Sequence, residues 1–153
     1  MTRTQRVSHT AGFTLVELLV TMAIIGIVSS VTAVNMIREI PRYRLTNAAS
    51  QLTWTFRGLR MRAISQHHAV KVTFTNNHVY TVWTDRNDNG ISDSGEAQTI
   101  DINGAYPGVK LASTADPTFN ATGTVTNLPT ITLTNPTGSK TLTMNILGDV
   151  TIQ

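Results

Sequence analysis

The stretch GFTLVELLV, residues 12–20, decides how the rest of this 153-residue chain is interpreted. One carboxylate, Glu17, lies inside an apolar run that extends from Phe13 to Ile37 and contains no other charged residue. About 20 apolar residues are enough for a helix to cross a bilayer. A carboxylate at mid-membrane costs about 2.5–3.5 kcal/mol, so it usually has a partner and a function. The run therefore predicts a membrane-spanning helix whose single acidic group needs a cation.

Three kinds of segment share these features. An ordinary single-span anchor explains the length of the run but gives no role to Glu17. A secretory signal peptide usually has an apolar region of about 7–15 residues, shorter than this run, and an acid inside that region is out of place. The stretch itself resembles the N-terminus of type IV prepilins and type II secretion pseudopilins, which are cut on the cytoplasmic side and keep the apolar helix.

This resemblance implies roles for three residues. Prepilin peptidase would cut after Gly12, which leaves Phe13 as the new, N-methylated N-terminus. Glu17 would become the fifth mature residue and would serve filament assembly. A buried carboxylate attracts a cation, and the ammonium group of Phe13 in a neighbouring subunit would supply one. We therefore expect a cleaved leader at residues 1–12 and a transmembrane assembly helix at residues 13–40.

The resemblance also implies a location and partners. The mature chain would cross the bacterial inner membrane once, with its C-terminal domain outside the cytoplasm. Its partners would be the lipid bilayer, prepilin peptidase, the inner-membrane assembly platform and other pilin or pseudopilin subunits. Arg3 and Arg6 in the leader favour a cytoplasmic N-terminus, but the arginines that follow the apolar run weaken this charge bias.

Composition limits the remainder to one small domain without disulfides. The chain has no cysteine, which excludes a disulfide framework, a redox motif and a cysteine-based metal site. The net charge of +3 is unevenly distributed. Residues 38–62 carry six arginines against one glutamate, whereas residues 63–153 carry four Lys or Arg against seven Asp or Glu. The pattern is a basic helix followed by a mildly acidic sheet.

Beyond Pro41, which predicts a kink or break in the helix, the pattern becomes amphipathic. Apolar residues spaced by three or four form one stripe, namely Leu45, Ala48, Leu52, Phe56, Leu59 and Ala63. Such a stripe predicts a second helical half at about residues 42–67, continuous with the first, that packs on a sheet.

After His68 the pattern alternates with a period of two. Residues 69–75 and 78–83 flank the polar turn Asn76-Asn77 and predict a β-hairpin. Further strands are predicted at residues 98–102, 109–112, 130–133, 140–146 and 150–152, with a surface loop at 113–129. The fold class is therefore α+β, with a long N-terminal helix packed on antiparallel sheet, and residues 41–153 hold the amphipathic helix and an extracytoplasmic β domain. Within the pilin superfamily this order most resembles the GspH/FimT group of minor pilins and minor pseudopilins.

The loop DRNDNGISDSGE, residues 85–96, matches the EF-hand calcium loop at every specified position. In that spacing alternate residues turn their oxygens inward, and Gly90 permits the sharp turn. The candidate calcium ligands are Asp85, Asn87, Asn89, the Ile91 carbonyl, Asp93 and Glu96. EF-hand loops join helices, however, and this loop follows a strand. A polar hairpin loop is the alternative interpretation, since Asp, Asn, Gly and Ser form turns for reasons of their own. Calcium is thus a candidate ligand, and no cofactor is required.

The arginine cluster after the apolar run also has two interpretations. A basic surface near Trp54 could bind DNA through phosphate contacts. Its candidate residues are Arg57, Arg60, Arg62 and Lys71. Some FimT-like pilins act in DNA uptake, and those that bind DNA carry a Gly-Arg-x-Arg motif near the C-terminus, whereas residues 148–151 here read GDVT. A solvated or filament-facing role is therefore favoured over DNA binding.

Enzyme activity has little support in this sequence. There is no cysteine nucleophile and no G-x-S-x-G elbow. His67, His68 and His78 form neither an i, i+4 pair nor an H-E-x-x-H motif. We therefore predict a non-enzymatic minor pilin or pseudopilin of a type IV pilus or a type II secretion pseudopilus. A DNA-binding minor pilin for natural transformation is the alternative.

Overall fold

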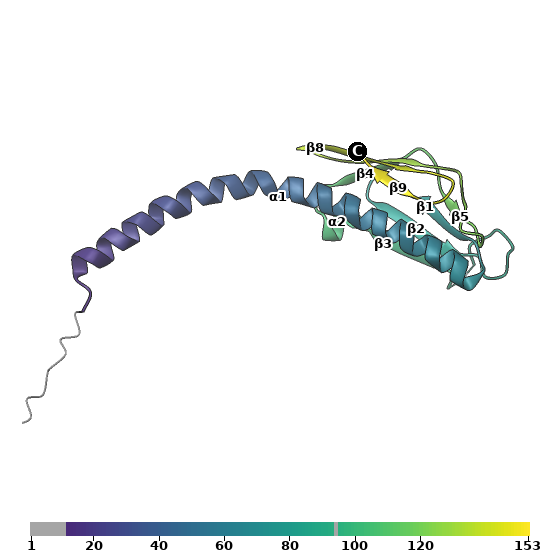
Figure 1. The fold of residues 1–153 in the computed structure, drawn as a ribbon, viewed down its shortest axis with the longest axis horizontal. Helices are drawn as coiled ribbons and strands as arrows, with labels where there is room; N and C mark the ends of the chain where they lie inside the picture. The colour runs from purple at the N-terminus through teal and green to yellow at the C-terminus, as the bar shows by residue number, and fades with distance from the viewer. Residues whose placement is uncertain (1–11, 94) are drawn as a thin grey trace, which may run out of the picture. The chain divides into compact units, whose positions relative to one another are not determined.

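The computed structural model describes residues 12–93 and 95–153, without the side chains of residues 31–35 and 38. Contacts within the chain divide it into two units, Met1–Arg38 and Glu39–Gln153. The long helix α1 (Leu15–Gln66) belongs to both. The other elements, shown in Figure 1, are β1 (Val70–Phe74), β2 (Val79–Thr84), β3 (Ala97–Asp101), α2 (Ile102–Ala105), β4 (Lys110–Ser113), β5 (Thr118–Phe119), β6 (Val125–Thr126), β7 (Thr130–Asn135), β8 (Gly138–Met144) and β9 (Val150–Ile152).

In the first unit, Thr14 caps the start of α1. The Glu17 N–H donates to the Thr14 hydroxyl at 3.2 Å, and the Leu18 N–H donates to the Thr14 carbonyl at 3.2 Å. A threonine followed three residues later by a glutamate is the spacing of a capping box. The helix therefore begins at a residue dictated by local sequence. Of the predicted leader, residues 1–11 lie outside the described residues.

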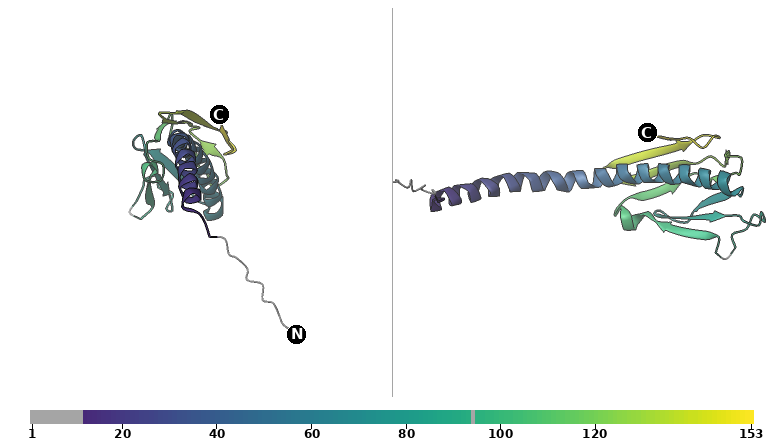
Figure 2. Two further views of the ribbon diagram at one scale, coloured as in Figure 1. Left: turned by 90° about the vertical axis from the view of Figure 1, so that its left-hand side faces the viewer. Right: turned by 60° about the horizontal axis from the view of Figure 1, so that its bottom comes forward.

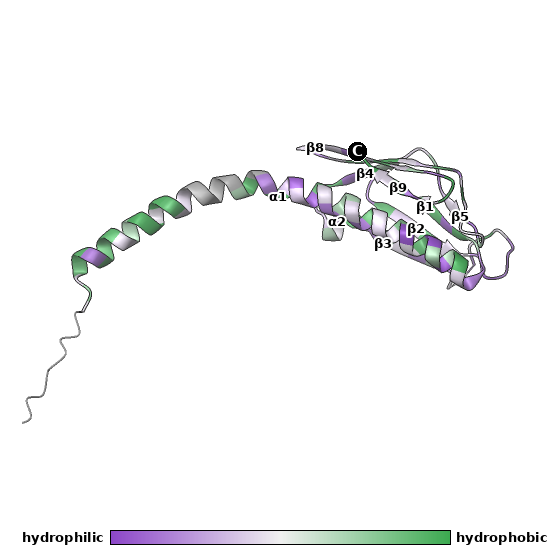
Figure 3. Ribbon diagram, in the orientation of Figure 1, coloured by the Kyte–Doolittle hydropathy of each residue, from purple (hydrophilic) through white to green (hydrophobic). Residues whose placement is uncertain are grey.

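The start of α1 is largely apolar, as the green colouring in Figure 3 shows, and its large apolar side chains between Leu15 and Val28 are exposed. Leu18, Leu19 and Val20 follow one another in the sequence, and each exposes more than half of its side chain. Successive helical residues point in directions about 100° apart. A helix that is apolar all round normally lies buried among other helices or in lipid.

The predicted membrane span, residues 13–40, includes residues 31–35 and 38, whose side chains lie outside the described set. In the part of the chain that the structure describes, no helix has both the length and the hydropathy needed to cross a bilayer.

In the second unit, α1 continues without interruption through Pro41, so the break considered at this residue is absent. Proline removes its own N–H from the helical ladder, and its ring crowds the carbonyl of the preceding turn, at a cost of about 3 kcal/mol. A side chain from the sheet reinforces this turn, because Asn135 Nδ2 donates to the Pro41 carbonyl at 2.6 Å.

Two antiparallel sheets pack against this part of α1, one on either side in Figure 2. The first sheet has the order β3-β2-β1-β5-β6 and the second the order β4-β7-β8-β9. All six residues of the predicted apolar stripe are buried. Phe56 and Phe119 are fully buried, with ring centroids 6.1 Å apart, so they join the helix to the first sheet. Each such side chain contributes roughly 1.5–3 kcal/mol through burial.

The α+β fold and the β1–β2 hairpin are confirmed, but the segment 113–129 is not only a loop. It contains β5 and β6, which pair with each other, while β5 also extends the first sheet beside β1. Strands of two residues are too short to show alternation, so the sequence pattern missed them. Residues 145 and 146, predicted as strand, lie beyond the end of β8. The short helix α2 follows β3 because Asp101 accepts a hydrogen bond from the Asn103 N–H at 2.8 Å.

Candidate functional site

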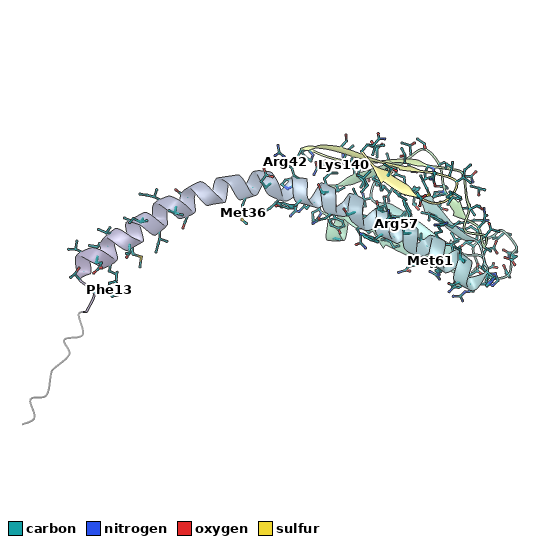
Figure 4. The ribbon with its side chains drawn as sticks, in the orientation of Figure 1. Phe13, Met36, Arg42, Arg57, Met61 and Lys140 are labelled. Carbon is teal, nitrogen blue, oxygen red and sulfur yellow. The ribbon has the colours of Figure 1, made fainter. Side chains whose placement is uncertain are left out.

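The predicted processing and assembly residues lie together at the start of α1. Phe13 exposes 82% of its surface, and Glu17 is exposed on the first turn of the helix. Figure 4 labels Phe13 at this end of the helix. A Cβ added to Gly12 would meet no atom within 4 Å, so this peptide is open to an approaching enzyme. The carboxylate of Glu17 has no hydrogen-bond partner among the residues that the structure describes.

The position of Glu17 has an electrostatic consequence. The N–H groups in the first turn of a helix carry a partial positive charge, which favours an acid there by about 0.3–1 kcal/mol. That attraction is small beside the cost of placing the carboxylate in an apolar environment. Glu17 is therefore suited to the first turn of α1 in water but needs a full positive charge once the helix is buried.

The candidate calcium loop is closed by its own hydrogen bonds. Asp85 is 4% exposed, and its two carboxylate oxygens accept the N–H groups of Asn89 at 3.0 Å and Gly90 at 2.9 Å. At the other end of the loop, Glu96 accepts the N–H of Arg86 at 3.0 Å and that of Asp93 at 3.1 Å. These bonds hold both ends of the loop.

The amide groups of the loop are also engaged. Asn87 and Asn89 both donate their Nδ2 groups to the same carboxylate oxygen of Asp93, at 2.8 and 2.9 Å. Across residues 12–93 and 95–153, no three His, Cys, Asp or Glu side chains gather into a metal-binding group. The six predicted calcium ligands thus lie in one loop, but calcium binding there stays a prediction.

The four candidate DNA-contact residues are engaged in different places. Arg57 lies over the Trp54 ring, 5.2 Å from its centroid, while Arg62 donates to Gln66 at 3.3 Å. These arginines are five positions apart in the helix, which places them about 140° apart around α1. Lys71 donates to the Gly90 carbonyl at 3.2 Å and lies 4.5 Å from the Trp83 ring centroid. These contacts place the four residues in different surroundings, and DNA binding by them stays a prediction.

The structure assigns Arg60, the fourth candidate, to packing between two hairpin turns. Its Nε donates to the Gly123 carbonyl at 2.9 Å in the β5–β6 turn. Its side chain also passes Gly148 in the β8–β9 turn so closely that a Cβ there would lie 2.7 Å from Arg60 Cδ. Glycine at these turns is the only sequence signal for this arrangement, and it does not identify the arginine.

A tyrosine that the sequence did not single out, Tyr80, faces α1 from β2 and is 3% exposed. Burial raises the pKa of the Tyr80 phenol, and its hydrogen bond with Thr55 acts in the opposite direction. The neutral phenol is therefore part of the core.

Comparison with known proteins supports the class of protein predicted from the sequence. The family profile described as type II transport protein GspH matches residues 48–148, and that of the prokaryotic N-terminal methylation motif matches residues 7–33. Among curated protein sequences, none matches this chain.

Two solved structures share the fold. The minor pseudopilin EpsH from the type 2 secretion system of Vibrio cholerae is similar with a TM-score of 0.56 and 14% identity, over 72% of this chain and 96% of that one. The type IV minor pilin FimU of Pseudomonas aeruginosa is similar with a TM-score of 0.54 and 18% identity, over 73% of this chain and 90% of that one. Family and fold are those of structural pilins rather than enzymes. The chain thus belongs to the GspH family of type II transport proteins, with the fold of the minor pilins and pseudopilins.

Proposed function

We propose that this chain is a structural subunit of a type IV pilus or a type II secretion pseudopilus, held in the bacterial inner membrane before assembly. Prepilin peptidase would cut between Gly12 and Phe13 and methylate the new N-terminus, and the unit Glu39–Gln153 would lie outside the cytoplasm. One observation carries the proposal: the methylation motif over residues 7–33 coincides with the exposed apolar start of α1, where Glu17 is the single carboxylate.

The physical step in assembly is the transfer of this helix from lipid to a bundle of neighbouring helices. Apolar side chains gain little from such a transfer, because both environments are apolar. Charge therefore sets the register: Glu17 of one subunit would meet the ammonium group of Phe13 in the next, and a displaced register would leave both charges unpaired. The fold that these subunits share is known in both filament types, since EpsH is a pseudopilin and FimU a pilin.

The test begins with the mature N-terminus. Mass spectrometry of the native protein should find N-methylated phenylalanine at position 13. Gly12→Val should leave the chain uncut, and the open space at Gly12 means that this change does not disturb the fold. A native protein that begins at any other residue would contradict the proposal.

The second arm of the test concerns Glu17. Glu17→Ala should be cut and stay in the membrane but fail to enter filaments, with Glu17→Gln as the matched neutral control that keeps the size of the side chain. Normal incorporation of both variants would exclude a role for this charge in assembly. Purification of native filaments with their neighbouring subunits identified distinguishes a pilus from a pseudopilus.

A further inference from the structure

The last strand, β9, presents an unpaired edge. It lies at the end of the sheet order β4-β7-β8-β9. Gln153 and Thr141 exchange N–H and carbonyl hydrogen bonds, and the Asn145 N–H donates to the Asp149 carbonyl. Because antiparallel hydrogen-bonded positions alternate, Val150 and Ile152 turn their N–H and C=O groups away from β8. These groups have no partner strand in the part of the chain that the structure describes.

A groove of about 410 Å³ lies along this edge, between β9 and the exposed side of α1. We call it the β9 groove; Trp54 and Arg57 line it from the helix and Val150, Thr151 and Ile152 from the strand. Trp54 exposes 66% of its surface. Met61 exposes 63% of its surface, and it lies on a turn of α1 next to that of Arg57 in Figure 4. The groove therefore offers main-chain donors and acceptors, an aromatic wall and apolar surface nearby.

The charge of the β9 groove is positive. No Asp or Glu lines it. The guanidinium of Arg57 is held over Trp54, and no carboxylate pairs with it among the described residues. Unpaired edges are templates for another strand, and main-chain bonds give such contacts their affinity while side chains give specificity. The occupant should thus be an extended strand that carries a carboxylate.

The fold itself presents a strand of this kind at its other sheet. β3 is the first strand in the order β3-β2-β1-β5-β6, and all of its residues except the half-buried Ile100 are exposed. The Thr84 N–H donates to the Glu96 carbonyl and the Ile102 N–H to the His78 carbonyl. By the same alternation, Ala97, Thr99 and Asp101 turn their main-chain groups outward.

We infer that the β9 groove of one subunit takes the edge strand β3 of a second copy, with Asp101 of that copy directed to Arg57. The two surfaces differ, so the contact is heterologous, and repeated heterologous contacts build open helical filaments rather than closed rings. The inference rests on the proposed function, because it supplies a contact between β domains in the filament beside that of the N-terminal helices.

The experiment uses the full chain in detergent micelles and the fluorescence of Trp54. The chain has two tryptophans, so Trp83→Phe leaves Trp54 as the only reporter. A second copy that lacks both tryptophans is then added. We expect a saturable change in Trp54 emission, and a several-fold weaker association when the reporter copy carries Arg57→Gln.

Two proline variants identify the strands. Ile152→Pro in the reporter copy and Thr99→Pro in the added copy each remove one outward N–H and leave the hydrogen bonds to β8 or β2 in place. Either should abolish the change in emission, while Ile152→Val and Thr99→Val should keep it. Circular dichroism checks that each variant is folded, and because the two prolines are in different copies, one folded variant is enough for the test.

A signal that survives both prolines, or no signal at any concentration, would overturn the inference. Association of the copies through α1 alone would give a signal that survives both prolines. The proposed function fails separately, through the mature N-terminus and Glu17, and neither of these enters the fluorescence measurement.

Discussion

Replacing Gly148 by alanine tests whether Arg60 joins α1 to the two hairpin turns. Gly148 has φ +76°, a left-handed conformation that costs an L-residue about 1–2 kcal/mol. The new Cβ would lie 2.7 Å from Arg60 Cδ, so the arginine has to move. It is flexible, but its Nε donates to the Gly123 carbonyl at 2.9 Å, and losing this bond costs about a further 0.5–1.5 kcal/mol.

Gly108→Ala is the matched control for this prediction. Gly108 has φ +86°, and a Cβ there meets nothing within 4 Å, so the variant carries the backbone strain without the clash. Urea unfolding of the full chain in micelles measures both free energies of unfolding. Gly148→Ala should lose more stability than Gly108→Ala, and the excess should be the part due to Arg60.

A double-mutant cycle with Arg60→Ala isolates that excess. With the arginine truncated, the alanine at position 148 loses most of its clash, so the two changes together should cost less than the sum of their separate costs. Equal losses for Gly148→Ala and Gly108→Ala, or strictly additive costs in the cycle, would refute the reasoning.

Four further predictions concern the core, pH, calcium and DNA. Thr84 is fully buried, and its hydroxyl has no hydrogen-bond partner among the described residues. Thr84→Val should therefore raise the free energy of unfolding by about 1 kcal/mol. A lower free energy of unfolding in a urea titration would show that the hydroxyl does have a hydrogen-bond partner. Because burial raises the pKa of Tyr80, the stabilising contribution of its neutral phenol should be fully present below the ordinary pKa of 10.0 and should be lost as the pH rises above that value. Tyr80→Phe should remove this loss of stability at alkaline pH. An unchanged pH profile in that variant would argue against a role for Tyr80. The ligand spacing of loop 85–96 predicts that millimolar calcium raises the melting temperature and that Asp93→Ala removes the rise. A melting temperature that does not change with calcium would favour the alternative, a polar hairpin loop held by its own hydrogen bonds. The dispersed cations predict that the chain retards duplex DNA only at low salt, and retardation at physiological salt in a gel-shift assay would show that they converge.

The sequence predicted the parts of the fold that depend on long periodic patterns. The stripe from Leu45 to Ala63 covers five turns of helix, and all of its members are buried in the structure. The β1–β2 hairpin was equally clear, because two alternating runs flank a polar turn. β5 and β6 were missed because each supplies one buried residue, Phe119 or Val125, and a single residue has no period.

The candidate sites were predictable only where chemistry is local in the sequence. The loop 85–96 closes through bonds between its own residues, so its pattern could be read directly. Arg57 and Arg60 are close in sequence, but their environments depend on segments about 60 to 90 residues further along the chain. The sequence shows the charges at these positions but not the contacts that they make. The β9 groove depends on sheet order, which no short motif encodes.

The start of α1 connects the local structure with the proposed assembly. Thr14 fixes the first turn through its own side chain and carbonyl, so the helix does not depend on the leader for its start. Cleavage after Gly12 would create an ammonium group one residue before this cap, next to the partial positive charge of the helix N-terminus. These two positive charges repel, and Glu17, on the same turn, is the negative group that offsets both. In the proposed function, a stored subunit would have only this partial compensation for Glu17 within its own chain, and assembly would supply the ammonium group of a neighbour. A helix in a displaced register would not gain that neighbouring cation, so the charges would favour the correct register.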